Sequence, residues 1–121
     1  MRARTLPESF AHALRGIGYV LATQRNMRVH TLAALAALLL AARLQVARWE
    51  WAAIIFAIAL VLASEAMNTA VEKTVDLATD EFHPLARAAK NCAAGAVLLA
   101  AAAALGIGWV VFGQRLLAVW R

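Results

Sequence analysis

Three long apolar stretches, separated by short polar segments, dominate the pattern of hydrophobic and polar positions along the chain. They cover about 29–47, 49–71 and 92–113, and only the last contains no charged residue. A helix that spans a membrane needs about 20 mostly apolar residues. The pattern therefore predicts an all-α fold, a polytopic membrane protein with three transmembrane helices.

The charged residues inside the first two stretches fit this prediction when they lie near the two membrane interfaces. Trp49 beside Glu50 marks one interface, because tryptophan is enriched where the hydrocarbon meets water. From Trp49 to Glu65 a helix rises by about 24 Å. Glu65 then lies close to the opposite boundary of a hydrocarbon core about 30 Å thick.

The segment before the first stretch, residues 6–24, has apolar and polar side chains on opposite sides of a helix. The apolar side carries Phe10, Leu14, Ile17 and Leu21, and the other side carries His12, Arg15 and Tyr19. This pattern predicts an N-terminal amphipathic helix. Such a helix either lies in the membrane surface or packs on the other helices, and the two interpretations are compatible.

Composition excludes several classes of protein. With 64% hydrophobic and 16% charged residues, the chain of 121 residues departs from a soluble domain, which has about 45–50% and about 25%. A disordered chain would have the opposite bias. The net charge of +5 comes without zinc-finger spacing or an aromatic RNA-binding motif, so we expect anionic lipids and phosphorylated ligands as partners rather than nucleic acid. The single Cys92 excludes an intrachain disulfide.

The distribution of positive charge predicts how the protein is oriented in its membrane. Lysine and arginine are enriched in cytoplasmic loops. The N-terminal segment and the loop between the second and third stretches are therefore expected in the cytoplasm. The basic N-terminus has no apolar run before a cleavage site, so we expect no cleaved signal peptide. The cytoplasmic set is Arg2, Arg4, Arg15, Arg25, Arg28, Lys73, Arg87 and Lys90, and the opposite set is Arg43, Arg48, Arg115 and Arg121.

The strongest candidate site is a polar stripe at the end of the second stretch. Glu65, Asn68, Glu72 and Asp76 fall within an arc of about 80° on a helix. Carboxylates this close repel one another unless a cation lies among them, and candidates are Mg²⁺, Lys90, Arg28 or a basic residue of another subunit. Charged residues near the hydrocarbon indicate function by default, although interhelical salt bridges are the simpler alternative.

Residues 64–76, SEAMNTAVEKTVD, resemble the signature of the prokaryotic diacylglycerol kinase family, Glu-x-x-Asn-Thr/Ser-Ala-x-Glu-x-x-Val-Asp. The similarity continues through 81–98, EFHPLARAAKNCAAGAVL, and 25–30, RNMRVH, and more loosely through 9–19. The RNMRVH and FHPLA segments are most similar to the branch that includes the undecaprenol kinases of Gram-positive bacteria.

The resemblance implies a homotrimer of three-span protomers in the bacterial inner membrane, with active sites shared between subunits at the cytoplasmic face. The implied reaction transfers the γ-phosphoryl group of ATP, with Mg²⁺, to the hydroxyl of a membrane lipid. Diacylglycerol and undecaprenol both remain open as the substrate.

The resemblance also implies roles for individual residues. Glu65 corresponds to the general base and Glu72 to a ligand of the nucleotide-bound Mg²⁺, with Asn68 and Asp76 in support. The implied ATP contacts are His12, Glu72, Glu81, His83, Lys90 and Asn91.

Two positions depart from the family pattern. Gln24 stands where the family often has a second metal-binding glutamate, and Asn91 stands where an aspartate is more usual. Both departures remove a negative charge near the metal. They keep open a catalytically impaired structural homologue, beside a second alternative, an ion- or proton-coupled membrane protein that uses Glu65.

Overall fold

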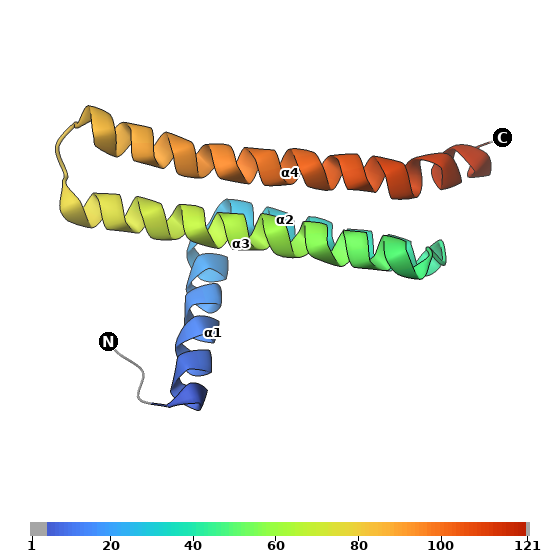
Figure 1. Cartoon of the computed structure of the whole chain (residues 1–121), viewed down its shortest axis with the longest axis horizontal. Coiled ribbons are helices and arrows are strands. Elements are labelled where there is room, and N and C mark those ends of the chain that lie inside the picture. The colour runs from blue at the N-terminus through green and yellow to red at the C-terminus, as the bar shows by residue number, and fades with distance from the viewer. Residues whose placement is uncertain (1–4, 121) are drawn as a thin grey trace.

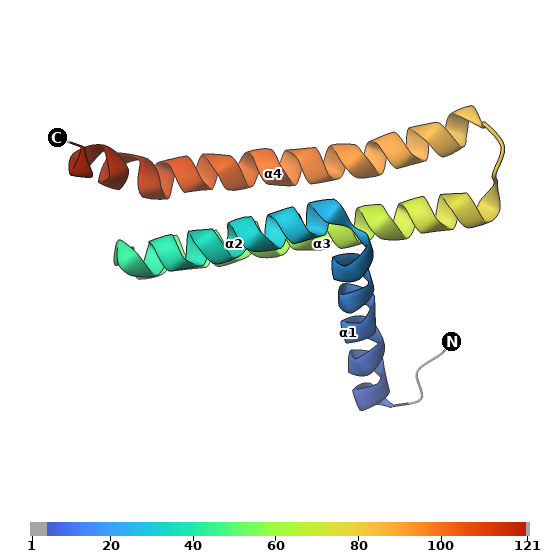
Figure 2. The same cartoon turned by 180° about the vertical axis from the view of Figure 1, so that it is seen from behind.

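The computed structural model describes residues 5–120, in four α-helices with no strand in that range. Arg2, Arg4 and Arg121, which entered the charge count, lie outside the described residues. Figures 1 and 2 show α3 and α4 lying side by side over most of their length, while α1 projects across the direction of the other helices. The helices are α1 (Leu6–Thr23), α2 (Arg25–Arg43), α3 (Arg48–Ala78) and α4 (Pro84–Val119).

Helix α1 begins and ends where its sequence specifies. Thr5 and Glu8 form a capping box, in which the Glu8 N–H donates to Thr5 Oγ1 (3.4 Å) and the Thr5 N–H donates to Glu8 Oε2 (3.2 Å). The helix stops at Gln24, whose extended backbone (φ −104°, ψ 118°) separates α1 from α2. Helix α1 therefore covers the predicted range 6–24 except for its last residue, although contact of this helix with a membrane surface stays a prediction.

Helix α2 lies one turn earlier in the chain than the apolar stretch 29–47 predicts. Nothing after Gln24 breaks the helix, so residues 25–28, which are polar except for Met27, become its first turn. At the other end the chain turns at Gln45, the only described non-glycine residue with positive φ (49°), and the Val46 N–H donates to the Ala41 carbonyl (3.3 Å). Residues 44–47 are thus a turn rather than the end of a span.

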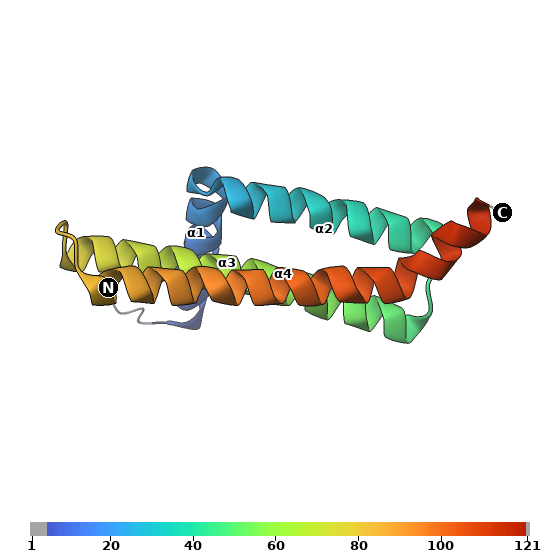
Figure 3. The ribbon, with the colours of Figure 1, turned by 90° about the horizontal axis from the view of Figure 1, so that it is seen from above.

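Helices α3 and α4 pair most extensively, α2 packs on α3, and α1 contacts both α2 and α3 (Figure 3). Within the described residues, α3 and α4 are the two helices long and apolar enough to cross a membrane. At 1.5 Å per residue their 31 and 36 residues extend for about 46 and 54 Å. Both therefore exceed a hydrocarbon core of about 30 Å and continue beyond it.

A bidentate ion pair joins the start of α3 to the end of α4. Arg115 Nη1 and Nη2 donate to Glu50 Oε1 (2.8 Å) and Oε2 (2.7 Å), and the Ala47 N–H also donates to Glu50 Oε2 (2.7 Å). The Glu50 side chain is buried beside the small core that contains Val46, Ile54 and Val111. This pair fixes the end of the bundle far from the polar stripe.

Candidate active site

The polar stripe on α3 becomes steadily more exposed toward the C-terminal end of the helix. Glu65 is 2% exposed and Asn68 is 8% exposed. Glu72 is half-buried and Asp76 is exposed. One helix face therefore leads from a protein-enclosed carboxylate to an accessible one, as the spacing predicts.

Hydrogen bonds fix part of the stripe and leave two oxygens open. Asn68 Nδ2 donates to Glu72 Oε1 (3.3 Å), and Thr69 Oγ1 donates to the Glu65 carbonyl (3.0 Å). Glu65 Oε2 and Asn68 Oδ1 are buried and have no hydrogen-bond partner among the residues described. Since a buried acceptor without a donor is costly, these atoms suit a ligand that brings an O–H group or a cation.

A polar pocket of about 550 Å³ lies at the turn between α3 and α4. Five predicted site residues line it together: Asp76, Glu81, His83, Lys90 and Asn91.

Asp76 and Lys90 form an ion pair across this pocket, with 2.5 Å between Lys90 Nζ and Asp76 Oδ1. This hydrogen bond, together with the charges of Lys90 and Lys73, lowers the pKa of Asp76 from its ordinary value. Lys90 is thus one of the cations that the stripe requires. Arg28, another candidate, instead donates to the Ala22 carbonyl (3.5 Å).

The loop between α3 and α4 is held by its own polar side chains. The Glu81 N–H donates to Thr79 Oγ1 (3.2 Å), and the Leu85 N–H donates to His83 Nδ1 (3.2 Å), so His83 caps α4. Pro84 follows in the first turn, where a missing N–H is harmless. Because Nδ1 of His83 accepts a hydrogen bond, Nε2 carries the proton of the neutral ring and can donate to a ligand in the pocket.

Two predicted site residues, Gln24 and His12, belong neither to the polar stripe on α3 nor to the lining of this pocket. Gln24 lies at the junction of α1 and α2, where its Nε2 donates to Thr23 Oγ1 (3.2 Å). His12 is exposed on α1, which extends away from α4 on the far side of α3 (Figure 1). One chain therefore does not bring His12 to the residues that line the polar pocket.

The residues 5–120 contain no cluster of three or more His, Cys, Asp or Glu side chains that could hold a metal ion by themselves. Magnesium does not require one, because it is usually bound by one or two carboxylates together with substrate phosphates and water. The Glu72 carboxylate, oriented by Asn68 and open on its other oxygen lone pairs, fits such a partial set.

Comparison with known proteins decides the family. Residues 11–112 match the family described as prokaryotic diacylglycerol kinase. The chain belongs to this family. It is 43% identical over 109 residues to the undecaprenol kinase of Bacillus subtilis, which covers 90% of this chain and 89% of the relative.

Other similar proteins carry the diacylglycerol kinase name. The chain is 44% identical over 107 residues to the diacylglycerol kinase of Synechocystis, covering 88% of this chain and 61% of the relative. With the diacylglycerol kinase of Helicobacter pylori the identity is 38% over 72 residues, 59% of this chain and 52% of that protein. The family and these names confirm the prediction that the chain is a lipid kinase.

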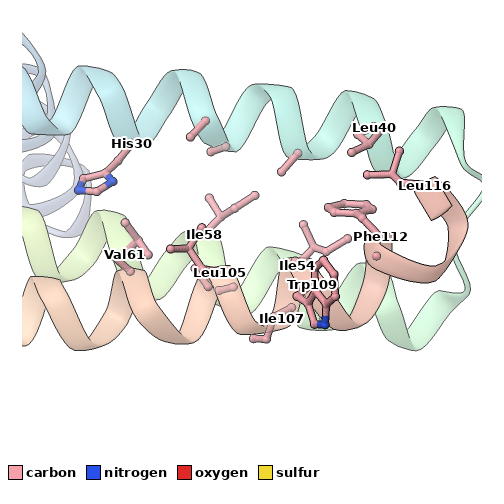
Figure 4. Close-up of a pocket in the computed structure, with 18 of the residues that line it drawn as sticks. His30, Leu40, Ile54, Ile58, Val61, Leu105, Ile107, Trp109, Phe112 and Leu116 are labelled. Carbon is pink, nitrogen blue, oxygen red and sulfur yellow. The ribbon is translucent and has the colours of Figure 1, made fainter. Parts of the chain in front are cut away.

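Sequence reasoning gave no role to His30, which lies next to the stripe. Its imidazole projects from α2 toward α3, near Val61 (Figure 4). It is close enough to Glu65 for an electrostatic interaction between the two side chains. No local sequence pattern relates His30 to Glu65, because 35 positions separate the two residues in the chain and they lie on different helices.

His30 also lines an apolar cavity of about 810 Å³ between α2, α3 and α4. In Figure 4 the imidazole lies at one end of this cavity, and Phe112 and Leu116 lie at the other. We call this space the apolar groove.

Proposed function

We propose that this lipid kinase uses MgATP to phosphorylate the hydroxyl of diacylglycerol or undecaprenol at the cytoplasmic membrane face. The observation that carries the proposal is the gradient along α3, from buried Glu65 to the Asp76–Lys90 pair in the polar pocket. A lipid hydroxyl lies near the membrane interface and ATP comes from water. A helix with this gradient presents side chains to both.

The proposed topology has three spans, with α2 as the first and α1 in the membrane surface. In its support, α1 exposes Phe10 and Leu14, and α4 exposes Leu98, Leu105 and Trp109. Apolar side chains exposed in this number suit lipid or another protein surface better than water. The excess of positive charge favours a cytoplasmic N-terminus and a cytoplasmic loop between α3 and α4.

In the proposed reaction Glu65 is the general base. Its Oε2, which has no hydrogen-bond partner among the described residues, accepts the proton of the lipid hydroxyl as the oxygen attacks the γ-phosphorus. Phosphoryl transfer otherwise depends mainly on positioning and on the neutralisation of charge. Glu65 and Glu72 are separated by a rise of about 10 Å, so one helix serves both substrates.

Nucleotide binding is assigned to the polar pocket and its surroundings. Lys90 neutralises phosphate charge, and Asp76 holds its ammonium group in place before ATP arrives. His83 and Glu81 contribute polar groups from the loop, and Asn91 adds an amide. His12, exposed on α1, reaches a nucleotide only across a subunit boundary, which agrees with a homotrimer that shares its sites.

Magnesium is assigned to Glu72 and Gln24. Bound with ATP, the ion would neutralise charge on the phosphates and polarise the transferring group. Gln24 lies at the α1–α2 junction, and α1 contacts α3, which carries Glu72. The amide oxygen of Gln24 can ligate the ion without adding negative charge.

The choice between the two lipids stays open. Identity to the named undecaprenol and diacylglycerol kinases is nearly equal, at 43% and 44%. The RNMRVH and FHPLA segments favour undecaprenol. Family membership disfavours the ion- or proton-coupled alternative.

The test is phosphorylation by purified protein in mixed micelles with radiolabelled ATP and Mg²⁺. Each lipid alcohol is supplied alone, with Glu65→Gln as the negative control. We expect labelled lipid from at least one alcohol and almost none from the variant. A folded protein that labels neither lipid contradicts the proposal.

A further inference from the structure

Among the described residues that line the apolar groove, His30 has the ionisable side chain. Apart from two tryptophans, every other described lining residue has an apolar side chain or none. The imidazole lies at the end of the groove near Val61, which is one helical turn before Glu65 on α3 (Figure 4). An ionisable side chain in such surroundings requires a reason beyond packing.

The reason lies in what happens to Glu65 during a catalytic cycle. Every transferred phosphoryl group leaves a proton on this carboxylate, which must lose it before the next lipid can react. At 2% exposure the Glu65 side chain has almost no direct contact with water. Its recovery therefore needs a neighbouring group that accepts a proton and is itself closer to solvent.

Two titratable side chains interact electrostatically with Glu65, namely His30 and Glu72. Glu72 already accepts a hydrogen bond from Asn68, and its assigned role beside a divalent cation makes it a poor proton acceptor. His30 is half-buried, so it is more exposed than Glu65. Imidazole is also the side chain best suited to take up and release a proton near neutral pH.

We propose that His30 acts through Glu65, accepting from it the proton of the lipid hydroxyl and passing that proton to water. The inference rests on the proposed kinase function. As the lipid oxygen bonds to the γ-phosphorus, the bond from this phosphorus to the bridging oxygen breaks and its electron pair leaves with ADP. The proton moves from the hydroxyl to Glu65 Oε2, then to a ring nitrogen of His30, and finally to water, which restores both side chains.

The decisive experiment compares two replacements of His30 in the full-length protein. Glutamine in His30→Gln retains hydrogen bonding but takes up no proton, and His30→Ala leaves space for free imidazole. We expect kcat to fall by about 10–100-fold in both variants, with the KM for lipid and for ATP changed by less than about 2-fold. Added imidazole should restore part of the kcat of His30→Ala and leave His30→Gln unchanged. Thr31→Ala, which removes the hydrogen bond from Thr31 Oγ1 to the Met27 carbonyl (2.8 Å), controls for a disturbed α2.

Each outcome decides a different question. Turnover of His30→Gln within about 2-fold of wild type overturns the proton relay, as does a slow His30→Ala that imidazole fails to rescue, because a structural role predicts no rescue. If His30→Ala does not fold, a wild-type kcat in folded His30→Gln still refutes the relay. A low kcat in His30→Gln is tested further by combining this change with Glu65→Gln. That double variant should be no slower than Glu65→Gln alone, and a further loss also counts against the relay. Absence of lipid phosphorylation by wild type refutes the kinase proposal itself.

Discussion

Replacement of Glu65 by glutamine is the most direct test of the proposed chemistry. The change keeps the volume and planar shape of the side chain, so the packing of α3 around a residue 2% exposed is preserved. The carboxylate Oε2, which has no partner among the described residues, is exchanged for an amide that has no basic site. Folding should therefore survive while proton abstraction is lost.

The size of the effect follows from what the side chain is asked to do. A positioned general base contributes about 10²–10⁴-fold to rate. At 1.36 kcal/mol for each tenfold, this corresponds to about 3–5 kcal/mol of the barrier. Burial excludes bulk water as a substitute base, so we expect kcat to fall by at least about 10²-fold.

The assay measures lipid phosphate formed from radiolabelled ATP in mixed micelles, with MgATP binding followed separately by calorimetry. Binding should be unchanged, because the polar pocket does not include position 65. Thr74→Ala is the matched control on α3, since Thr74 is exposed and its hydroxyl donates to the Ala70 carbonyl within the same helix (2.8 Å). If folded Glu65→Gln turns over within about 3-fold of wild type, Glu65 is not the general base.

The other predictions concern metal, phosphate and pH. Glu72→Ala should weaken MgATP binding and Gln24→Glu should lower the Mg²⁺ concentration needed for half-maximal rate, as a Mg²⁺ titration of both variants would reveal. Lys90→Ala should abolish lipid phosphorylation while leaving the helical circular dichroism unchanged. The opposite result would support a proton-coupled protein: wild type phosphorylates no lipid, and proton flux in liposomes survives Lys90→Ala but not Glu65→Gln. The lowered pKa of Asp76 stabilises the fold above the ordinary aspartate value of about 3.9, and this contribution is lost as pH falls through the lower folded-state pKa. The melting temperature of wild type should thus exceed that of Asp76→Asn near neutral pH and converge with it as pH falls well below the ordinary aspartate value, and a gap independent of pH would contradict the ion pair's role.

Much of the fold could be predicted because helices follow from local sequence. The capping box at Thr5 and Pro84 near the start of α4 mark boundaries by local chemistry. The position of α2 along the chain was harder to predict, because hydropathy records where apolar residues are and not where the helical backbone begins and ends. Its first polar turn and the turn at Gln45 depend on backbone conformation that no apolar pattern encodes.

Within the candidate site, the predictable part is the part that lies on one helix or in one loop. The stripe from Glu65 to Asp76 needs only the helical period, and the pairing of Asp76 with Lys90 needs only a short loop between two long helices. The ion pair of Glu50 with Arg115 joins residues 65 positions apart, and His30 acts electrostatically on Glu65 from another helix. Such contacts depend on how helices rotate against one another, which a single sequence does not specify.

Glu50 and Glu65 lie toward opposite ends of α3 and have different physical roles. Glu50 is a buried carboxylate whose two oxygens accept three hydrogen bonds from Arg115 and the Ala47 N–H, so the side chain is held in place. Glu65 is as deeply buried, yet one of its oxygens lacks any partner in the described part of the chain. An unsatisfied buried carboxylate costs stability, whereas a satisfied one does not to the same degree. The same helix therefore holds one glutamate whose hydrogen bonds join α3 to α4 and another whose buried, unpartnered oxygen suits a ligand that brings an O–H group or a cation.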